Sequence, residues 1–130
     1  MVKLFLLSIL CHIIDDFILQ VQMLSKLKQR SFWISECKKY DIDYKKYRND
    51  YKVSLFIHSL SWSIMIMLPY ILTLSINPFI LLFLISFNLL IHYIVDDLKA
   101  NQFKLNLLED QLIHFGQLIL TFIFILLILA

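Results

Sequence analysis

Four long apolar stretches separated by polar segments dominate the chain. They cover residues 2–20, 53–76, 78–97 and 107–130. Each is close to the ~20 residues that an α-helix needs to cross the hydrocarbon core of a bilayer. None alternates like a barrel strand, and backbone groups in lipid must be hydrogen-bonded within the protein. The pattern therefore predicts an all-α, polytopic membrane protein, a single domain (residues 1–130) of four transmembrane helices in a bundle.

The polar segments predict the orientation of this bundle. Eleven of the twelve Lys and Arg residues lie in residues 21–52 and 98–106. Because short loops rich in Lys and Arg stay in the cytoplasm, we expect both segments inside the cell and both termini outside. The second connection, "LSINPF", carries no charge and predicts a tight external turn, with Asn77 as the cap and Pro78 as the first residue of the next helix.

The long polar segment, residues 21–52, has a pattern of its own. Tyr40, Tyr44, Tyr47 and Tyr51 recur at helical spacing, and basic residues occupy the positions between them. This predicts an amphipathic cytoplasmic loop helix between the first two spans, with its lysines near anionic lipid headgroups. Aromatic and basic residues also suit single-stranded nucleic acid. The net charge of only +2 and the adjoining membrane favour lipid, so no nucleic acid is expected as a partner.

Composition makes the ionisable residues inside the spans informative. The chain is 60% hydrophobic and only 17% charged. A charged side chain in the hydrocarbon costs about 2.5–3.5 kcal/mol on insertion scales, so such residues usually face a bundle interior and mark function. The first span nevertheless contains "CHIIDDFILQ" and the third contains "HYIVDD", which place His12 four residues before Asp16 and His92 four residues before Asp96.

The fourth span reverses this order, since "EDQLIHFGQ" places Asp110 four residues before His114. It also runs in the opposite direction through the membrane, so all three pairs have the same arrangement in depth. His58 lies at a similar depth in the second span. The four histidines of the chain, one in each span, are therefore expected in one layer, with a carboxylate layer on its cytoplasmic side.

Imidazole and carboxylate groups at one depth predict a metal site. They are ligands of Zn, Mn and Fe, and helix bundles hold metals with residues three or four apart on facing helices. A divalent ion of this kind is the expected cofactor. The alternative is a set of local His–Asp hydrogen bonds near a solvated interface. The expected ligands are His12, His58, His92, His114, Asp16, Asp96 and Asp110, with Gln20, Asn88, Gln111 and Gln117 as polar neighbours.

These motifs resemble an uncharacterised family of small bacterial and phage integral membrane proteins, catalogued as domain of unknown function 3307. The likeness covers "HIIDDFILQ", "IHSL", "HYIVDDLKA" and "EDQLIHFGQL". Members often carry a further histidine four residues after the second-span histidine, and here that position is Trp62. The resemblance implies the inner (cytoplasmic) membrane of a bacterium as the location. It implies no activity, because the family has none assigned.

Three functions fit the pattern. The first is a metal-dependent hydrolase acting at the membrane surface, with Asp16, Asp96 and Asp110 as ligands or general base and Lys99 binding an anionic group. The second is a proton or cation transport component, because Asp and His inside spans also suit ion passage. The third is a non-catalytic membrane module that recruits a cytoplasmic protein or a second copy of the chain, with the polar layer only stabilising the bundle.

Overall fold

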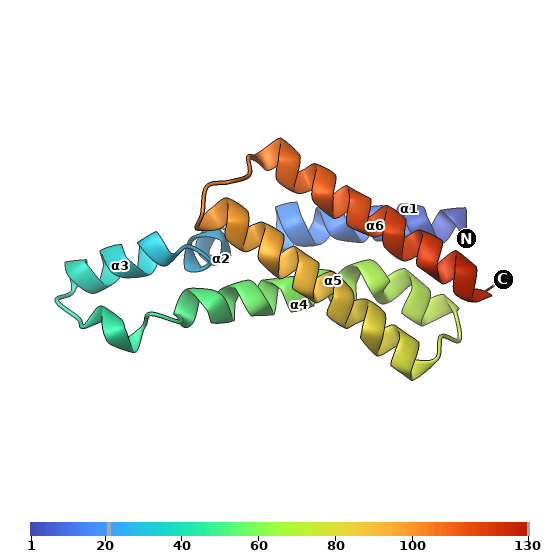
Figure 1. The fold of residues 1–130 in the computed structure, drawn as a ribbon, viewed down its shortest axis with the longest axis horizontal. Helices are drawn as coiled ribbons and strands as arrows, with labels where there is room; N and C mark the ends of the chain where they lie inside the picture. Colours follow the sequence, from blue (N-terminus) through green and yellow to red (C-terminus); the bar gives the residue numbers. More distant parts are fainter. Residues whose placement is uncertain (21, 130) are drawn as a thin grey trace.

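The computed structural model describes residues 1–20 and 22–129, and this part of the chain contains helices and no strands (Figure 1). Val21, in the predicted loop, and Ala130, at the end of the last predicted span, lie outside it. The all-α prediction is confirmed for the described residues. The elements are α1 (Val2–Ile13), the π-helix η1 (Ile14–Leu19), α2 (Gln22–Leu27), α3 (Arg30–Lys39), the 3-10 helix η2 (Tyr44–Lys46), α4 (Asp50–Thr73), α5 (Pro78–Ala100) and α6 (Leu107–Leu129).

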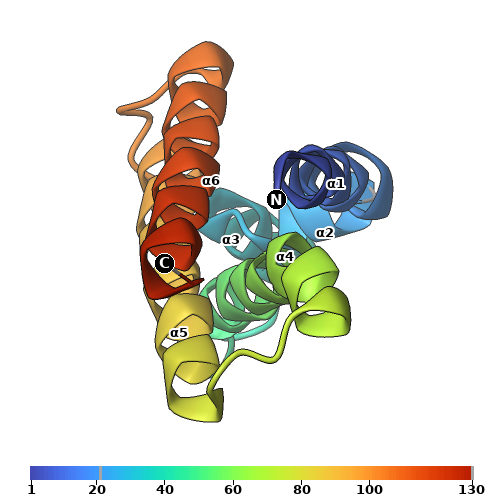
Figure 2. The ribbon, with the colours of Figure 1, turned by 90° about the vertical axis from the view of Figure 1, so that its right-hand side faces the viewer.

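Four of these helices close into a bundle. Helix α4 packs against α1 and α5, and α6 packs against α5 and α1. Viewed along the long axis, α5 and α6 lie on one side and α1 and α4 on the other (Figure 2). Both termini lie at one end of the molecule, and α3 lies at the opposite end (Figure 1).

Within residues 1–20 and 22–129, three helices, rather than the predicted four, are long and apolar enough to cross a membrane. They are α4 with the turn before it (Tyr44–Thr73), α5 and α6. The first predicted span is split into the 12 residues of α1 and the 6 residues of η1. The split has a local cause, since the uninterrupted apolar run ends at Cys11 and is followed by His12, Asp15 and Asp16.

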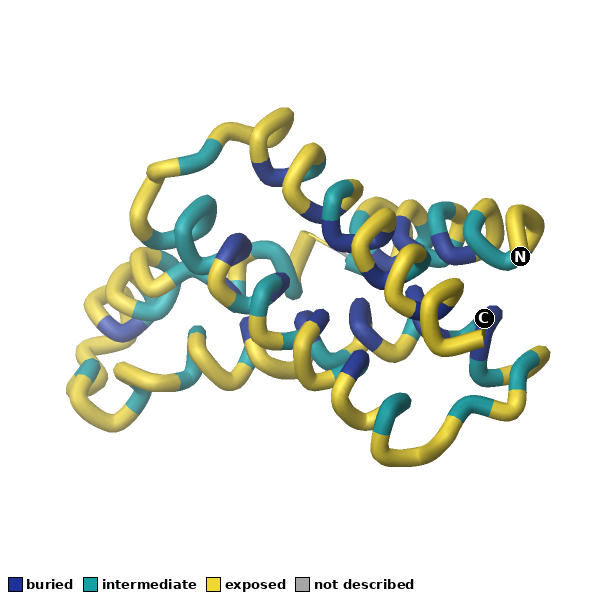
Figure 3. The backbone as a smooth tube through the Cα atoms, turned by 45° about the vertical axis from the view of Figure 1, so that its right-hand side comes forward, coloured by how far each residue is buried: buried dark blue, intermediate teal, exposed yellow. Residues whose placement is uncertain are grey.

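Burial in the bundle is the reverse of that in a water-soluble domain. Large apolar side chains such as Leu82, Leu120 and Leu127 are exposed on the outside. Buried positions lie where the helices face one another (Figure 3), and more polar than apolar residues are among them. Exposed apolar patches of this extent are typical of surfaces that contact lipid. The buried polar residues are Ser8, His12, Asp15, Lys28, His58, Ser59, Ser63, Asn88, His92, Asp96, Asp110, His114, Gln117 and Thr121.

The apolar part of the core fills the end of the bundle nearer the chain termini. It includes Ile66 and Tyr70 from the second half of α4, Leu84 from the first half of α5, and Ile125 from the last turns of α6. The turn between α4 and α5 closes this end as the sequence predicts. Asn77 caps α5, its Oδ1 accepting a hydrogen bond from the Phe79 amide at 2.9 Å, and Pro78 is the first residue of the helix.

The prediction of a helix lined by four tyrosines is wrong. Tyr40 follows the end of α3 as its C-cap, Tyr44 begins η2, Tyr47 lies in a turn, and only Tyr51 belongs to α4. Local contacts reverse the chain instead. Asp41 has a φ of 54°, and the Tyr47 ring stacks on Trp33 with centroids 6.1 Å apart. The loop helices are α2 and α3, which precede this region.

Candidate metal centre

The ionisable residues of the spans meet at the end of the bundle that carries α2 and α3. Helix η1 and α5 end there, whereas α4 and α6 begin there, so residues from both ends of the chain reach the same layer. We call this set the His/Asp centre. It consists of Asp16, His58, His92, Asp96, Asp110 and His114.

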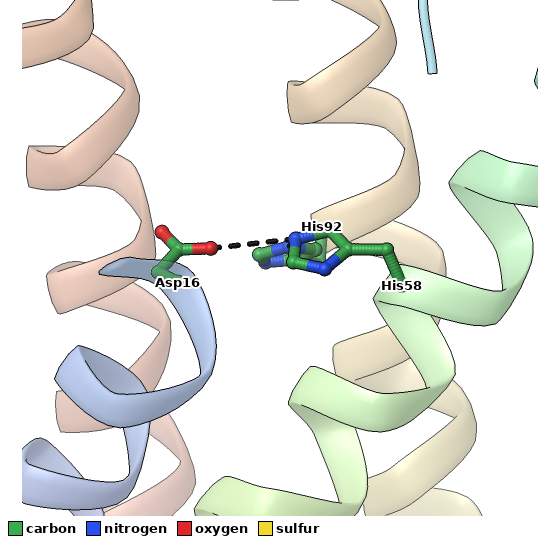
Figure 4. Close-up of side chains that lie close together, drawn as sticks. All are labelled: Asp16, His58 and His92. Carbon is green, nitrogen blue, oxygen red and sulfur yellow. Dashed lines mark hydrogen bonds and ion pairs between the residues drawn. The ribbon is translucent and has the colours of Figure 1, made fainter. Parts of the chain in front are cut away.

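One side of the His/Asp centre joins three helices. Asp16 comes from η1, His58 from α4 and His92 from α5 (Figure 4). The Nε2 atom of His58 lies 3.3 Å from Oδ1 of Asp16 and 3.2 Å from Nε2 of His92. One ligand atom of each of the three residues lies within 4.8 Å of the others, so the group could hold a metal ion.

The other side shares His92 and adds α6. The Nε2 atom of His114 lies 3.5 Å from Oδ1 of Asp96 and 3.3 Å from Oδ1 of Asp110. His92, Asp96 and His114 form a second group that could hold a metal ion, and all three are buried. His92 stacks on His114 with ring centroids 4.1 Å apart, which fixes the two imidazoles relative to each other.

The distances between the imidazole nitrogens and the carboxylate oxygens fit binding of one shared metal ion better than direct hydrogen bonds. Around a tetrahedral metal with bonds of about 2.0–2.1 Å, two ligand atoms lie about 3.3 Å apart. The carboxylate oxygens approach His58 and His114 at 3.3–3.5 Å. A charge-assisted N–H···O hydrogen bond is shorter, about 2.7–2.9 Å. The centre is therefore wide enough for a metal ion to lie between its ligand atoms.

Each carboxylate contacts both a histidine and an outer partner, and in Asp96 the oxygen that pairs with Lys28 also lies 3.5 Å from His58 Nε2. Oδ1 faces an imidazole in Asp16, Asp96 and Asp110. The outer oxygens have separate partners: Asp96 Oδ2 pairs with Lys28 Nζ at 2.5 Å, Asp110 Oδ2 with Lys99 Nζ at 2.5 Å, and Asp16 Oδ2 accepts from Gln111 Nε2 at 2.8 Å. Outer contacts of this kind orient the ligating oxygen in metal sites.

The hydrogen bonds of Gln117 determine which ring nitrogen of His114 carries the hydrogen. Gln117 Nε2 donates to the backbone oxygen of Asn88 at 2.8 Å, so its Oε1 is the atom that faces His114 Nδ1, at 3.4 Å. An amide oxygen only accepts, hence Nδ1 carries the hydrogen and Nε2 of the neutral ring presents a lone pair. That lone pair faces two carboxylate oxygens, an arrangement that requires a cation between them, either a proton or a metal.

Three buried atoms of the His/Asp centre, and one of the neighbouring Asp15, have no hydrogen-bond partner within the described part of the chain. They are Asp15 Oδ2, His92 Nδ1, Asp110 Oδ1 and His114 Nε2. An unsatisfied buried polar atom costs about 1–3 kcal/mol, so several at one place indicate a missing partner. For His114 Nε2 and Asp110 Oδ1, which face each other, a shared metal ion would supply it.

His12, which the sequence predicts as a ligand, belongs to neither group. It lies in the histidine layer, with its ring centroid 6.2 Å from that of His114. Its Nδ1, however, accepts a hydrogen bond from Trp62 Nε1 at 2.8 Å. Trp62 also stacks on His92, with centroids 4.3 Å apart. The Trp62 indole thus contacts both His12 and His92 and fixes them relative to each other.

Two residues of this region were missed in the sequence. Lys28 appears there as one of many basic loop residues, yet its side chain is only 8% exposed and its ammonium group reaches Asp96. Asp15 is not among the predicted site residues, yet it is 1% exposed and its Oδ1 accepts from Ser61 at 2.7 Å. The wider turn of the π-helix directs both aspartates inward, and such turns are frequent at functional sites. No sequence signal marks either residue.

The remaining predicted site residue, Lys99, lies at the rim. Its side chain is 35% exposed and contacts Asp110. The structure thus gathers His58, His92, His114 and the three aspartates and adds Lys28. No protein-family model, curated protein or solved structure matches this chain, so the family resemblance of its motifs is a prediction.

Proposed function

We propose that this chain is an integral protein of the bacterial inner membrane that binds a divalent metal ion and uses it for hydrolysis. The observation that carries the proposal is the convergence of buried imidazole nitrogens and carboxylate oxygens, at metal-ligand spacing, from η1, α4, α5 and α6. The proposed metal is Zn, Mn or Fe. His58, His92, His114, Asp16, Asp96 and Asp110 would supply its ligands.

The proposal includes four membrane crossings, with α1 and η1 together forming the first. Two features support it. Helix α1 completes the ring of packed helices, and both termini lie at the same end, as an even number of crossings requires. Eleven of the twelve basic residues lie in the segments at the other end, which we therefore propose to be cytoplasmic, with anionic lipid headgroups as partners of the basic segment.

An enzyme is favoured over a purely structural metal site because the centre borders a cavity. Asp96 and Lys99 both line this cavity, and catalytic sites keep a position open where structural sites are closed. A bound divalent metal would supply an activated water at neutral pH. Asp110 contacts His114 and Asp16 contacts His58 within the His/Asp centre, and either carboxylate could accept a proton from that water.

The transport alternative is less well supported, because the polar path stops inside the bundle. Asn88, Gln117 and Thr121 extend it by one layer through mutual hydrogen bonds. Beyond them lies the apolar core with Tyr70 and Ile125. A conduit for protons or cations would need polar groups at both ends of the bundle.

Metal analysis of the purified protein tests the proposal. Protein prepared in detergent without chelators should contain a stoichiometric amount of Zn, Mn or Fe by mass spectrometry. Removal of the ion with a chelator should lower the thermal stability, and return of the same ion should restore it, because a ligand that binds only the folded state stabilises it. Protein without stoichiometric metal whose melting temperature does not respond to these ions would contradict the proposal.

Gln117→Leu is expected to lower the metal affinity about 10- to 100-fold without removing any ligand. The variant loses the acceptor that fixes the Nδ1 proton of His114, and outer contacts of ligating histidines typically have effects of this size. Chelator competition measures the affinity. Thr121→Val is the matched control, since it breaks a hydrogen bond to Asn88 but touches no ligand, and its metal affinity should equal that of the wild type.

A further inference from the structure

A cavity of about 210 Å³ adjoins the His/Asp centre at the end of the bundle that carries α2 and α3. Its walls come from η1 and the residue after it, the α2–α3 turn and the end of α5, and Asp96 belongs both to its lining and to the centre. The polar lining residues are Gln20, Ser25, Lys28, Gln29, Asp96 and Lys99.

Hydrogen-bond donors dominate this lining. Lys28 and Lys99 bring two ammonium groups, and Gln20, Ser25 and Gln29 add amide and hydroxyl groups. Lys28 is held in a defined position, because its ammonium contacts Asp96 and the side-chain oxygen of Gln20. The Gln20 contact is made when the Gln20 amide is oriented so that both its oxygen and its nitrogen have hydrogen-bond partners. The buried ammonium of Lys28 and the ammonium of Lys99 at the rim suit a compact anion with several acceptor oxygens.

A bound divalent metal would remove an excess of negative charge from the region. Lys28 and Lys99 pair with Asp96 and Asp110, whereas Asp15 and Asp16 beside His58 add two further negative charges. A divalent cation held by these carboxylates would offset the two charges. An anion entering the cavity would then meet two ammonium groups beside a neutral centre rather than a negative one.

We infer that this cavity binds a phosphate group, so that the substrate of the proposed hydrolase is a phosphate ester. The inference rests on the proposed function, because a bound metal would offset the negative charge that otherwise repels an anion. Lysine ammonium groups bind phosphate as point charges, and the multiple oxygens of phosphate match donors placed on several walls. Asp96 belongs both to the cavity lining and to the His/Asp centre, so an ester bound here would lie beside the residues that would hold the metal. The metal would supply an activated water, and hydrolysis would leave the oxygen of that water on phosphorus and one of its protons on the departing alcohol as the P–O ester bond breaks.

Two classes of molecule carry a phosphate group that would fit this cavity, namely a lipid headgroup and a water-soluble phosphate compound. Phe103 favours access from the membrane. It lines the cavity from the connection between α5 and α6, and its side chain is 82% exposed. An exposed aromatic ring next to a polar cavity suits the level of the headgroups.

Calorimetric titration with inorganic phosphate tests the inference on full-length protein in detergent. Metal-loaded protein should bind phosphate saturably, and chelator-treated protein should bind it at least about tenfold more weakly. Lys28→Gln and Lys99→Gln should each weaken binding to the metal-loaded protein about tenfold or more, since each removes a charged donor. Lys26→Gln and Lys104→Gln remove equal charge from exposed positions nearby and should bind like the wild type.

The source of the phosphate follows from a second arm in phosphatidylcholine nanodiscs. If phosphatidic acid in the disc competes with inorganic phosphate, the ligand is a lipid phosphate, and if it does not, the ligand is a water-soluble phosphate. Metal-loaded wild type that shows no saturable binding at millimolar phosphate would overturn the inference, as would unchanged binding in both lysine variants. Should Lys28→Gln fail to fold, Lys99→Gln decides alone. Wild type that binds no metal would instead overturn the proposed function.

Discussion

His92→Ala should remove the bound metal from the protein, whereas His12→Ala should leave it in place. His92 belongs to both candidate ligand groups, and its Nε2 lies 3.2 Å from that of His58. His12 lies in the same layer but belongs to neither group, and Trp62 occupies its Nδ1. Loss of a shared ligand should weaken metal binding by more than the ~100-fold upper range for outer contacts. Chelator competition and the metal-to-protein ratio measure the difference.

The two substitutions are closely matched in other respects. Each truncates a buried imidazole that contacts Trp62, so each leaves a cavity of similar size in the same layer. His92→Phe separates ligation from packing, because it keeps an aromatic ring against Trp62 without a ligating nitrogen, and it should also lose the metal. Equal metal content in His92→Ala and His12→Ala would mean that the histidine layer only stabilises the bundle.

The meeting of the His and Asp side chains on regular helices could be predicted from the sequence. His92 and Asp96, and likewise Asp110 and His114, are four residues apart, and helical geometry places such side chains on one face. The reversed order in the fourth span predicts that both pairs lie at the same depth, and His114 of α6 lies 3.5 Å from Asp96 of α5. This proximity could be predicted because α5 and α6 are long helices without interruption through this layer. That these residues bind a metal stays a prediction.

The remaining parts of the site depend on irregular structure or on single tertiary contacts. Asp15 turns inward because η1 is a π-helix, and Lys28 reaches Asp96 from the turn between α2 and α3. His12 has the predicted spacing from Asp16, yet the indole N–H of Trp62 binds it instead. A pattern of helical spacing does not contain this information. The tyrosine spacing failed for the same reason, because the turn at Asp41 interrupts the helical register.

Lys28→Met should destabilise the metal-free protein by about 3 kcal/mol or more, and the metal-loaded protein by much less. The Lys28–Asp96 ion pair is buried, with side chains 8% and 6% exposed. Removing one partner of such a pair leaves an uncompensated charge, which typically costs about 3–5 kcal/mol. In the metal-loaded protein, Asp96 would ligate the ion, which replaces the lost ammonium as its counter-charge. Free energies of unfolding in detergent, measured with and without bound metal, give the two values.

The same prediction has a second, independent measurement, because stability and ligand binding are linked. If the substitution costs less stability in the metal-loaded state, the metal must bind Lys28→Met more tightly than the wild type, by about tenfold for each 1.4 kcal/mol of difference. Lys26→Met, at an exposed position two residues away, should change neither quantity, since surface substitutions usually stay within about 0.5 kcal/mol. Equal destabilisation with and without metal would mean that the ion does not take the charge of Asp96. That carboxylate would then serve as the partner of Lys28 alone, and the metal would have to be held by Asp16, His58 and His92.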